Sequence, residues 1–258
     1  MSTASTIEWT DATWNPVVGC RKVSPGCANC YAETMSARLA SVARSKPVDK
    51  MGRLENYLKV VDEDKRRFNG RAVAVPEAFD EPLRWKKPRR VFVNSMSDLF
   101  HEDVAVEDVW RIFSTMEKTP CHTYQILTKR PDRMRDILQA CRVCQNIWLG
   151  TSVENRKHGV PRIDILREVP AAIRFLSCEP LLEDLGELNL DGIHWVIAGG
   201  ESGPGARPID VNWVRSIRDQ CQFQGVAFFF KQWGGVRKKE NGRELDGRTW
   251  DEMPEAGS

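Results

Sequence analysis

The chain has 258 residues, of which 41% are hydrophobic and 29% are charged, so it can bury the core of an ordinary globular protein. Its 38 basic and 36 acidic residues give a formal net charge of +2, and charge alone therefore neither indicates nor excludes a nucleic-acid partner. Eight cysteines over this length are too sparse for a small fold held together by disulfides.

Apolar runs in the chain are short. Glu8, Asp11 and Asn15 interrupt the first twenty residues, which therefore lack the apolar region of a secretory signal. The longest apolar run, Val226 to Phe230, is far below the roughly 18 residues of a membrane helix. We expect a soluble, cytoplasmic protein without a membrane segment. In that reducing compartment, clustered cysteines are metal ligands or redox thiols more often than disulfides.

The first predicted element is a strand over Thr13–Val18, and it leads directly into a loop with three cysteines. Cys20, Cys27 and Cys30 have the spacing C-x6-C-x2-C. A structural zinc site normally has four protein ligands, whereas three thiolates on a [4Fe-4S] cluster leave one iron open to a small molecule. The three cysteines therefore indicate a metal site with an open position.

A charge-rich segment at residues 45–90 follows the first predicted helix, and we interpret it as an insertion within a single domain spanning 1–258. It ends in the basic run Arg84-Trp85-Lys86-Lys87-Pro88-Arg89-Arg90. Cations beside an aromatic ring suit phosphate binding and base stacking on a nucleic-acid strand or nucleotide. Composition alone favours a solvated loop whose long side chains cover a buried strand.

The rest of the chain alternates between apolar runs and amphipathic segments. Val104–Lys118 has helical spacing, Pro131 suits the first residue of a helix to Ala140, and Asp210 or Asn212 could cap a helix through Cys221. Such alternation predicts parallel strands with helices outside, hence an α/β fold with a partial or complete (β/α) barrel. The first strand brings the count to about seven, with further strands at 91–93, 124–127, 147–150, 173–176, 195–198 and 226–230.

Polar clusters follow most of these strands at their carboxyl ends, where parallel barrels place their active sites. We therefore expect the cysteine loop to share one rim with a set of charged side chains. Loops are also polar simply because they are solvated, so each cluster taken singly is weak. The charged members are Asp98, Lys129, Glu154, Glu179, Glu201 and Lys231.

The cysteine loop after the first strand of such a barrel resembles that of the radical S-adenosylmethionine (SAM) enzymes, although their usual first gap is three residues rather than six. Nearly the whole chain is similar to an uncharacterised family of phage- and prophage-associated, radical-SAM-like proteins. The segments that carry this resemblance are Trp14-Asn15-Pro16, Gly19-Cys20, Ser24-Pro25-Gly26-Cys27, Cys30-Tyr31-Ala32-Glu33, Ser97-Asp98-Leu99-Phe100, Leu127-Thr128-Lys129-Arg130-Pro131, Leu149 to Asn155, Glu179-Pro180-Leu181-Leu182, Gly199-Gly200-Glu201-Ser202-Gly203 and Phe230-Lys231-Gln232-Trp233-Gly234.

The resemblance implies a [4Fe-4S] cluster on Cys20, Cys27 and Cys30, with SAM on its fourth iron. Lys22 and loop N–H groups would offset the charge of the cluster. Reductive cleavage of SAM would give a 5'-deoxyadenosyl radical that abstracts a substrate hydrogen. The electron would come from a donor such as flavodoxin or ferredoxin, and the phage context favours modification of a nucleic acid or nucleotide.

The same resemblance assigns roles to the strand-end residues. Ser97 and Asp98 would take the methionine amine of SAM, and Ser152 and Glu154 its ribose hydroxyls or carboxylate. We assign Gly199, Gly200 and Glu201 to cofactor binding as well, because glycine lets the backbone approach a ligand closely. The candidate catalytic residues are Glu179, Lys129 and Lys231.

A zinc-stabilised nucleic-acid-binding protein without radical catalysis is the alternative. Its fourth zinc ligand would be one of His101, Cys121, Cys178 and His194. Zinc loops usually contain two close ligand pairs, and this loop has one. A separate pair, Cys141 and Cys144, is expected at a helix end on the face opposite the active site, where a catalytic role is disfavoured.

Overall fold

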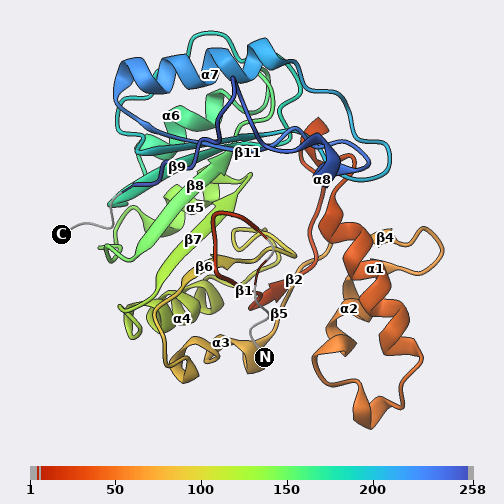
Figure 1. Ribbon diagram of the computed structural model, residues 1–258. Helices are drawn as coiled ribbons and strands as arrows, with labels where there is room; N and C mark the ends of the chain where they lie inside the picture. The colour runs from red at the N-terminus through yellow and green to blue at the C-terminus, as the bar shows by residue number, and fades with distance from the viewer. Residues whose placement is uncertain (1–4, 6, 255–258) are drawn as a thin grey trace. The chain divides into compact units, whose positions relative to one another are not determined.

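The computed structural model describes residue 5 and residues 7–254 (Figure 1). Its internal contacts divide the chain into two compact units. The first runs up to Val23 and resumes at Cys30–Thr128, and the second contains Ser24–Asn29 and the chain from Lys129 onward. No helix in the described part of the chain is long and apolar enough to cross a bilayer.

Three parallel strands form the sheet of the first unit, in the order β1-β6-β7. β1 is Ala12–Trp14, β6 is Arg90–Val93 and β7 is Thr123–Thr128. The helix α4 (Val106–Glu117) connects β6 to β7. It buries Val109, Ile112, Phe113 and Met116 on one face, whereas Val106 is exposed, and it confirms the helix predicted for Val104–Lys118.

The predicted first strand over Thr13–Val18 is wrong in its extent. β1 ends at Trp14, and Val17–Val18 form a separate strand, β2, which pairs antiparallel with β5 (Val73–Ala74). Pro16 has no backbone N–H to donate, so the parallel ladder with β6 cannot continue through it. The chain leaves the sheet at this point and enters the cysteine loop.

The segment at 45–90 folds into short elements rather than one solvated loop. It follows α1 (Tyr31–Arg44), and α2 lies beside α1 (Figure 1). Ala37 and Ala40 of α1 pack with Tyr57 and Val60 of α2 in a small core that also includes Val18 and Met96. The elements of this segment are η2 (Val48–Lys50), η3 (Gly52–Leu54), α2 (Glu55–Val60), β3 (Val61–Asp62), β4 (Arg67–Phe68), β5, α3 (Pro76–Phe79) and η4 (Pro82–Arg84).

Four parallel strands form the sheet of the second unit, in the order β8-β9-β10-β11. α6 lies against β8 and β9, and α7 lies against β10 and β11 (Figure 1). Together with the first unit, this confirms an α/β fold built as a partial (β/α) barrel. The elements of the second unit are η1 (Pro25–Cys27), α5 (Pro131–Leu138), β8 (Ile147–Ser152), α6 (Pro161–Arg167), β9 (Ile173–Cys178), β10 (Trp195–Gly199), α7 (Val211–Gln224), β11 (Ala227–Gln232) and α8 (Lys238–Asn241).

Local chemistry at the helix ends explains their boundaries. Pro131 is the first residue of α5, as predicted. Asp210 caps α7, and its Oδ1 accepts the N–H of Asn212 at 2.7 Å. α7 continues past the predicted end at Cys221 to Gln224, and it stops at Gly225, whose φ of 69° is left-handed.

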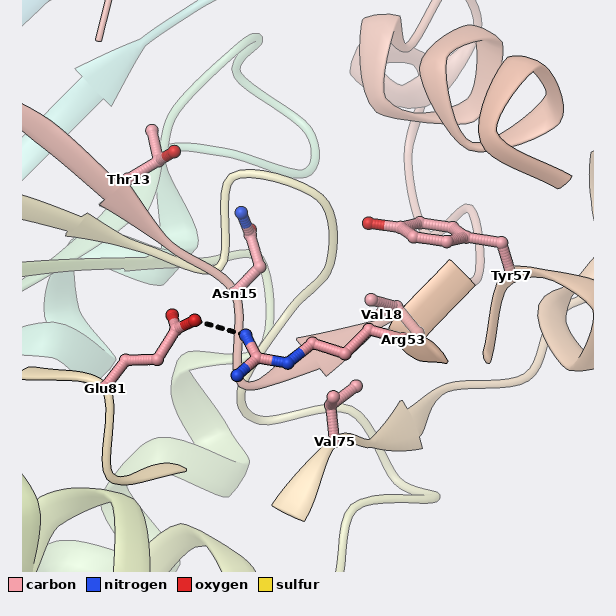
Figure 2. Close-up of a pocket in the computed structure, with 7 residues that line it drawn as sticks. All are labelled: Thr13, Asn15, Val18, Arg53, Tyr57, Val75 and Glu81. Carbon is pink, nitrogen blue, oxygen red and sulfur yellow. Dashed lines mark hydrogen bonds and ion pairs between the residues drawn. The ribbon is translucent and has the colours of Figure 1, made fainter. Parts of the chain in front are cut away.

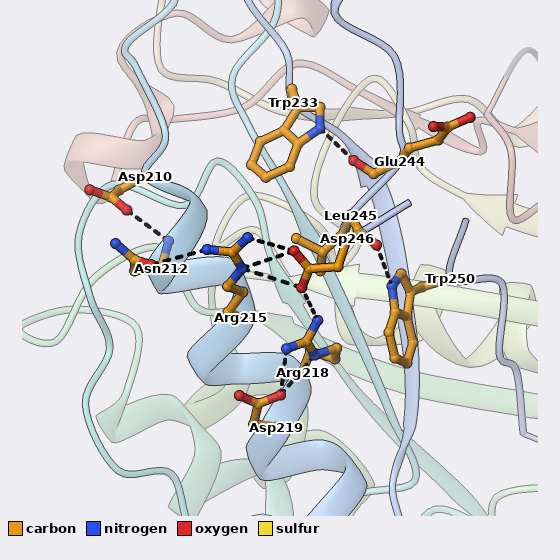
Figure 3. Close-up of polar contacts among 10 residues, drawn as sticks. All are labelled: Asp210, Asn212, Arg215, Arg218, Asp219, Trp233, Glu244, Leu245, Asp246 and Trp250. Carbon is orange, nitrogen blue, oxygen red and sulfur yellow. Dashed lines mark hydrogen bonds and ion pairs between the residues drawn. The ribbon is translucent and has the colours of Figure 1, made fainter. Parts of the chain in front are cut away.

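The segment from Leu245 to Glu252 lies along β11. The N–H of Phe230 donates to the carbonyl of Trp250 at 2.9 Å, and the N–H of Glu252 donates to the carbonyl of Phe228 at 3.2 Å. Asp246 anchors this segment to α7 through ion pairs with Arg215 and Arg218 (Figure 3). The outer edge of β11 is therefore covered by the chain itself.

Candidate functional site at the strand ends

The carboxyl ends of β8 to β11 bring several of the predicted residues together in the second unit. Glu179, just after β9, and Lys231, in β11, form an ion pair with Oε1 and Nζ 3.0 Å apart. The hydroxyl of Ser177 donates to the other oxygen of Glu179 at 3.2 Å. Both charged side chains are mostly buried, with 13% of Glu179 and 19% of Lys231 exposed. These two candidate catalytic residues thus form one polar group.

Glu154 follows β8 and is completely buried. Its Oε2 lies 2.8 Å from Nη1 of Arg162 in α6, and the same Nη1 donates to the carbonyl of Ser152 at 2.8 Å. Burial by itself raises the pKa of Glu154, but the charges of Lys129 and Arg162 and a hydrogen bond with Ser24 outweigh it and lower the pKa. The structure therefore brings the predicted residues Ser152 and Glu154 into one buried network, and the charge of the half-buried Lys129 acts on Glu154.

The short segment Ser24–Asn29, which contains Cys27, is fastened to the carboxyl end of β10. The amide Nδ2 of Asn29 donates to Oε2 of Glu201 and to the carbonyl of Gly205, each at 2.9 Å. Arg207 forms an ion pair with Glu201 at 2.5 Å and donates to the carbonyl of Pro25 at 3.0 Å. Glu201 is therefore a shared acceptor that fixes the cysteine-bearing segment.

The same segment lies directly on Glu154. A Cβ added to Gly26 would be 2.8 Å from Cγ of Glu154, so only glycine fits here without displacing that side chain. Cys27 ends the short helix η1, and its Sγ lies 3.8 Å from the hydroxyl of Ser24. The half-exposed thiol of Cys27 is thus held at the ends of β8 and β10.

Cys20 and Cys30 belong to the first unit. Cys20 contacts the carbonyl of Arg21 at 3.5 Å, and Cys30 occupies the position before the first residue of α1. Both thiols are half-buried, and neither forms a disulfide within the described residues. Lys22, expected to offset cluster charge, forms an ion pair with Glu33 at 2.9 Å.

Ser97 and Asp98 stabilise the loop that follows β6. The hydroxyl of Ser97 donates to the carbonyl of Val17 at 2.8 Å. Asp98 is 5% exposed, and its Oδ1 accepts from the N–H of Phe100 at 3.0 Å and from the hydroxyl of Thr128 at 2.7 Å. These two residues thus connect the ends of β6 and β7 to β2 within the first unit.

Gly199 and Gly200 are required by close packing inside the protein. A Cβ on Gly199 would lie 2.7 Å from Oε1 of Glu179, and one on Gly200 would lie 2.0 Å from the carbonyl of Trp233. The glycine pair therefore lets the Glu179 carboxylate and the loop after β11 approach β10. The role of these glycines in cofactor binding stays a prediction.

The basic run ends at the amino end of the first sheet. Arg90 begins β6 and donates to Asp11 beside β1, with its backbone N–H 2.8 Å from Oδ2. The Arg89 guanidinium lies 5.3 Å from the centre of the Trp85 ring.

Cys141 and Cys144 lie between the end of α5 and the amino end of β8, as expected, and both are free.

The donor set fits an iron-sulfur cluster in its chemistry, because Cys20, Cys27 and Cys30 are half-exposed thiols on one loop, and none of them forms a disulfide within the described residues. Within the described residues, no three His, Cys, Asp or Glu side chains form a ready-made metal-binding group. Of the proposed fourth zinc ligands, Cys178 is fully buried and burial raises the pKa of its thiol. His194 already accepts the N–H of Arg174 through Nδ1 at 3.1 Å.

Three residues that bind the carboxylates at the strand ends were not indicated by the sequence. Arg162 neutralises a buried carboxylate eight positions earlier in the chain, and no local spacing connects the two. Asn29 and Arg207 both bind Glu201 from distant segments. The one available signal is the glycine-rich stretch before Arg207, which marks a loop near the end of β10.

The chain belongs to a family described as "Protein of unknown function (DUF5131)", whose model matches residues 4–254. No curated protein matches it. A cysteine-to-serine mutant of spore photoproduct lyase is similar in structure, with 12% identity and a TM-score of 0.47 over 85% of this chain and 63% of that chain. A double mutant of the same enzyme with bound AdoMet and dinucleoside spore photoproduct has 13% identity and a TM-score of 0.41 over the same shares. This chain thus spans less than two thirds of those proteins.

Acidification is expected to destabilise the protein through Glu154 and Glu201. Burial raises the pKa of Glu201, but hydrogen bonds from Arg207 and Asn29 outweigh it, so that both carboxylates have lowered pKa values. Their stabilisation is complete above the unfolded pKa of about 4.3 and is lost as the pH falls through the lower folded value. In urea unfolding, the contribution of the two carboxylates to the free energy of unfolding should be constant from pH 7 to about pH 5 and should decline below about pH 5.

Glu201→Gln tests this assignment, and the exposed Glu187 provides the control as Glu187→Gln. The first variant should show a shallower decline in the free energy of unfolding between about pH 5 and pH 3. The second should follow the wild type. Equal slopes for Glu201→Gln and the wild type would contradict the role of Glu201.

Proposed function

We propose that the protein is a radical SAM-type enzyme that binds a [4Fe-4S] cluster through Cys20, Cys27 and Cys30. The observation that carries the proposal is the anchoring of the Cys27 segment (Ser24–Asn29) to the carboxyl end of β10 by Asn29 and Arg207, together with its packing on Glu154 at the end of β8. Parallel β/α folds place their reactive groups at this edge of the sheet. A metal-binding thiol fastened there is difficult to explain by folding alone, because zinc sites that only stabilise a fold use four protein ligands.

The protein's own residues would position the reactants. When bound, the cluster and SAM would supply reductive cleavage of the sulfonium and a radical that removes a substrate hydrogen. The Lys231 ammonium has three donors, of which Glu179 takes one, so that Lys231 could orient a polar substrate group. Glu201 and Glu154 would keep the Cys27 segment in place, and Lys129 would support Glu154. Ser97, Asp98 and Ser152 stay candidates for SAM contacts.

We propose a nucleic acid or nucleotide as the substrate. Support comes from the exposed cations Arg84, Lys86 and Lys87 around the half-buried Trp85, since cations beside an aromatic ring suit phosphates and bases. Association with phage genomes, an electron donor of the flavodoxin or ferredoxin type and a cytoplasmic location belong to the same proposal. Cysteines that form no disulfide within the described residues agree with a reducing compartment.

Iron and sulfide analysis of the anaerobically reconstituted protein tests the proposal. We expect about four irons per chain, absorption near roughly 400 nm, and 5'-deoxyadenosine from SAM after reduction. Colourless protein that holds one zinc and no iron would contradict it. That result would favour a zinc-stabilised nucleic-acid-binding protein, whose binding should fall steeply with salt.

A further inference from the structure

The first unit contains a cavity next to the end of β1, which we call the Asn15 cavity. Its volume is about 160 Å³, and a cavity of about 150 Å³ is large enough for a benzene ring. It lies among elements of the 45–90 segment and the chain just after β1 (Figure 2). Its walls include Asn15, Val18, Arg53, Tyr57, Val75 and Glu81.

Two polar groups in the cavity wall have no hydrogen-bonding partner in the described part of the chain. Asn15 uses Oδ1 to accept the N–H of Met96 at 3.0 Å and the hydroxyl of Ser95 at 3.1 Å, which fixes its amide and leaves Nδ2 as a donor. Tyr57 is 9% exposed, and its hydroxyl points toward Asn15 (Figure 2). Among the residues that the structure describes, neither Nδ2 of Asn15 nor the Tyr57 hydroxyl has a hydrogen-bonding partner. Burial raises the pKa of Tyr57, so the hydroxyl keeps its proton.

The charged side chains that line the cavity favour an uncharged ligand. Arg53 is the one cation among the lining residues, and it forms an ion pair with Glu81 (Figure 2). The Glu81 carboxylate would repel a phosphate, and the paired guanidinium offers little compensation. Val18 and Val75 are each 3% exposed and provide apolar contact for the face of a ring.

We propose that the Asn15 cavity binds a nucleobase. The ligand class rests on the proposed function, in which a nucleic acid or nucleotide is the substrate. A base placed outside its stack is recognised by hydrogen bonds along its edge and by apolar contact with its faces. Asn15, Tyr57 and the Arg53–Glu81 pair supply donors and acceptors, and the two valines supply the apolar contact. The sugar and phosphates stay outside the cavity.

Calorimetric titration of the protein with guanosine, adenosine, cytidine, uridine and thymidine tests this site, with inorganic phosphate as a further probe. At least one nucleoside should bind saturably, and phosphate should not compete with it. Tyr57→Phe removes only the hydroxyl and should weaken binding about 3- to 10-fold. Tyr124→Phe makes the same change at a tyrosine outside the cavity, whose hydroxyl pairs with that of Thr119, and should leave the affinity unchanged. Melting temperatures establish that both variants fold.

The inference fails if no nucleoside binds, if Tyr57→Phe binds as the wild type does, or if phosphate competes for the site. Binding is measured without reductant or SAM, and so it is independent of radical chemistry. Protein that forms 5'-deoxyadenosine and binds no nucleoside would keep the proposed function and overturn the nucleobase site. Iron-free protein that binds nucleosides with the expected Tyr57 dependence would keep the site and overturn the proposed function.

Discussion

The variant Cys27→Ser is expected to lose its iron-sulfur cluster. Cys27 is one of three proposed thiolate ligands, and a serine hydroxyl stays protonated and binds iron poorly near neutral pH. Residues that only support a metal ligand contribute about 10- to 100-fold to affinity or activity, so loss of the ligand itself should cost at least about 100-fold. Iron content should fall from about four per chain to background, and formation of 5'-deoxyadenosine should fall with it.

The matched control is Cys121→Ser, which makes the same change at an exposed cysteine outside the loop. It should keep the iron content and absorption spectrum of the wild type. Because Cys27 is half-exposed and ends a single short turn, its substitution should leave far-ultraviolet circular dichroism unchanged. A Cys27→Ser protein that retains about four irons would contradict the assigned ligand set.

The variant Arg162→Ala is expected to lower the free energy of unfolding by about 3 kcal/mol. Arg162 is the ion-pair partner of Glu154, and both side chains are buried, with 9% and 0% exposed. Removing the guanidinium leaves a charged carboxylate in the interior and also frees the carbonyl of Ser152. Urea denaturation at pH 7 measures the difference. The Cys27 segment lies on Glu154, so cluster retention should also decrease.

The matched control is Arg156→Ala, which breaks an ion pair with Asp184 in which 58% of the arginine and 47% of the aspartate are exposed. Exposed pairs contribute little, and we expect a loss below about 1 kcal/mol. The double variant Glu154→Met with Arg162→Met removes both charges and should be more stable than Arg162→Ala alone. Equal losses for Arg162→Ala and Arg156→Ala would show that burial of the Glu154–Arg162 pair has no special importance.

The α/β fold could be predicted from sequence because buried parallel strands are continuous apolar runs. Trp195–Gly199 and Ala227–Gln232 are two such strands, and their positions match the expected runs closely. The end of the first strand was predicted less accurately, because β-branched Val17 and Val18 favour a strand wherever they pair. Their actual partner, β5, lies more than fifty residues later, beyond the reach of local patterns.

The polar strand ends could be located from the sequence, but their partners could not. The pairing of Glu179 with Lys231 connects strands that are not adjacent in the chain. The Glu201 contacts with Asn29 and Arg207 depend on how the Cys27 segment crosses the sheet edge. Glycine at 26, 199 and 200 was visible in the sequence, but each one makes room for a particular neighbouring atom that only the folded chain reveals.

The segment from Leu245 to Glu252 has a consequence for the behaviour of the protein at high concentration. An uncovered edge strand offers free N–H and C=O groups to any extended chain, including another copy of the same protein. β11 is rich in phenylalanine and would be prone to such recruitment. With Trp250 and Glu252 already bonded to Phe230 and Phe228, that edge is closed to the addition of foreign strands, and the protein is protected there from aggregation.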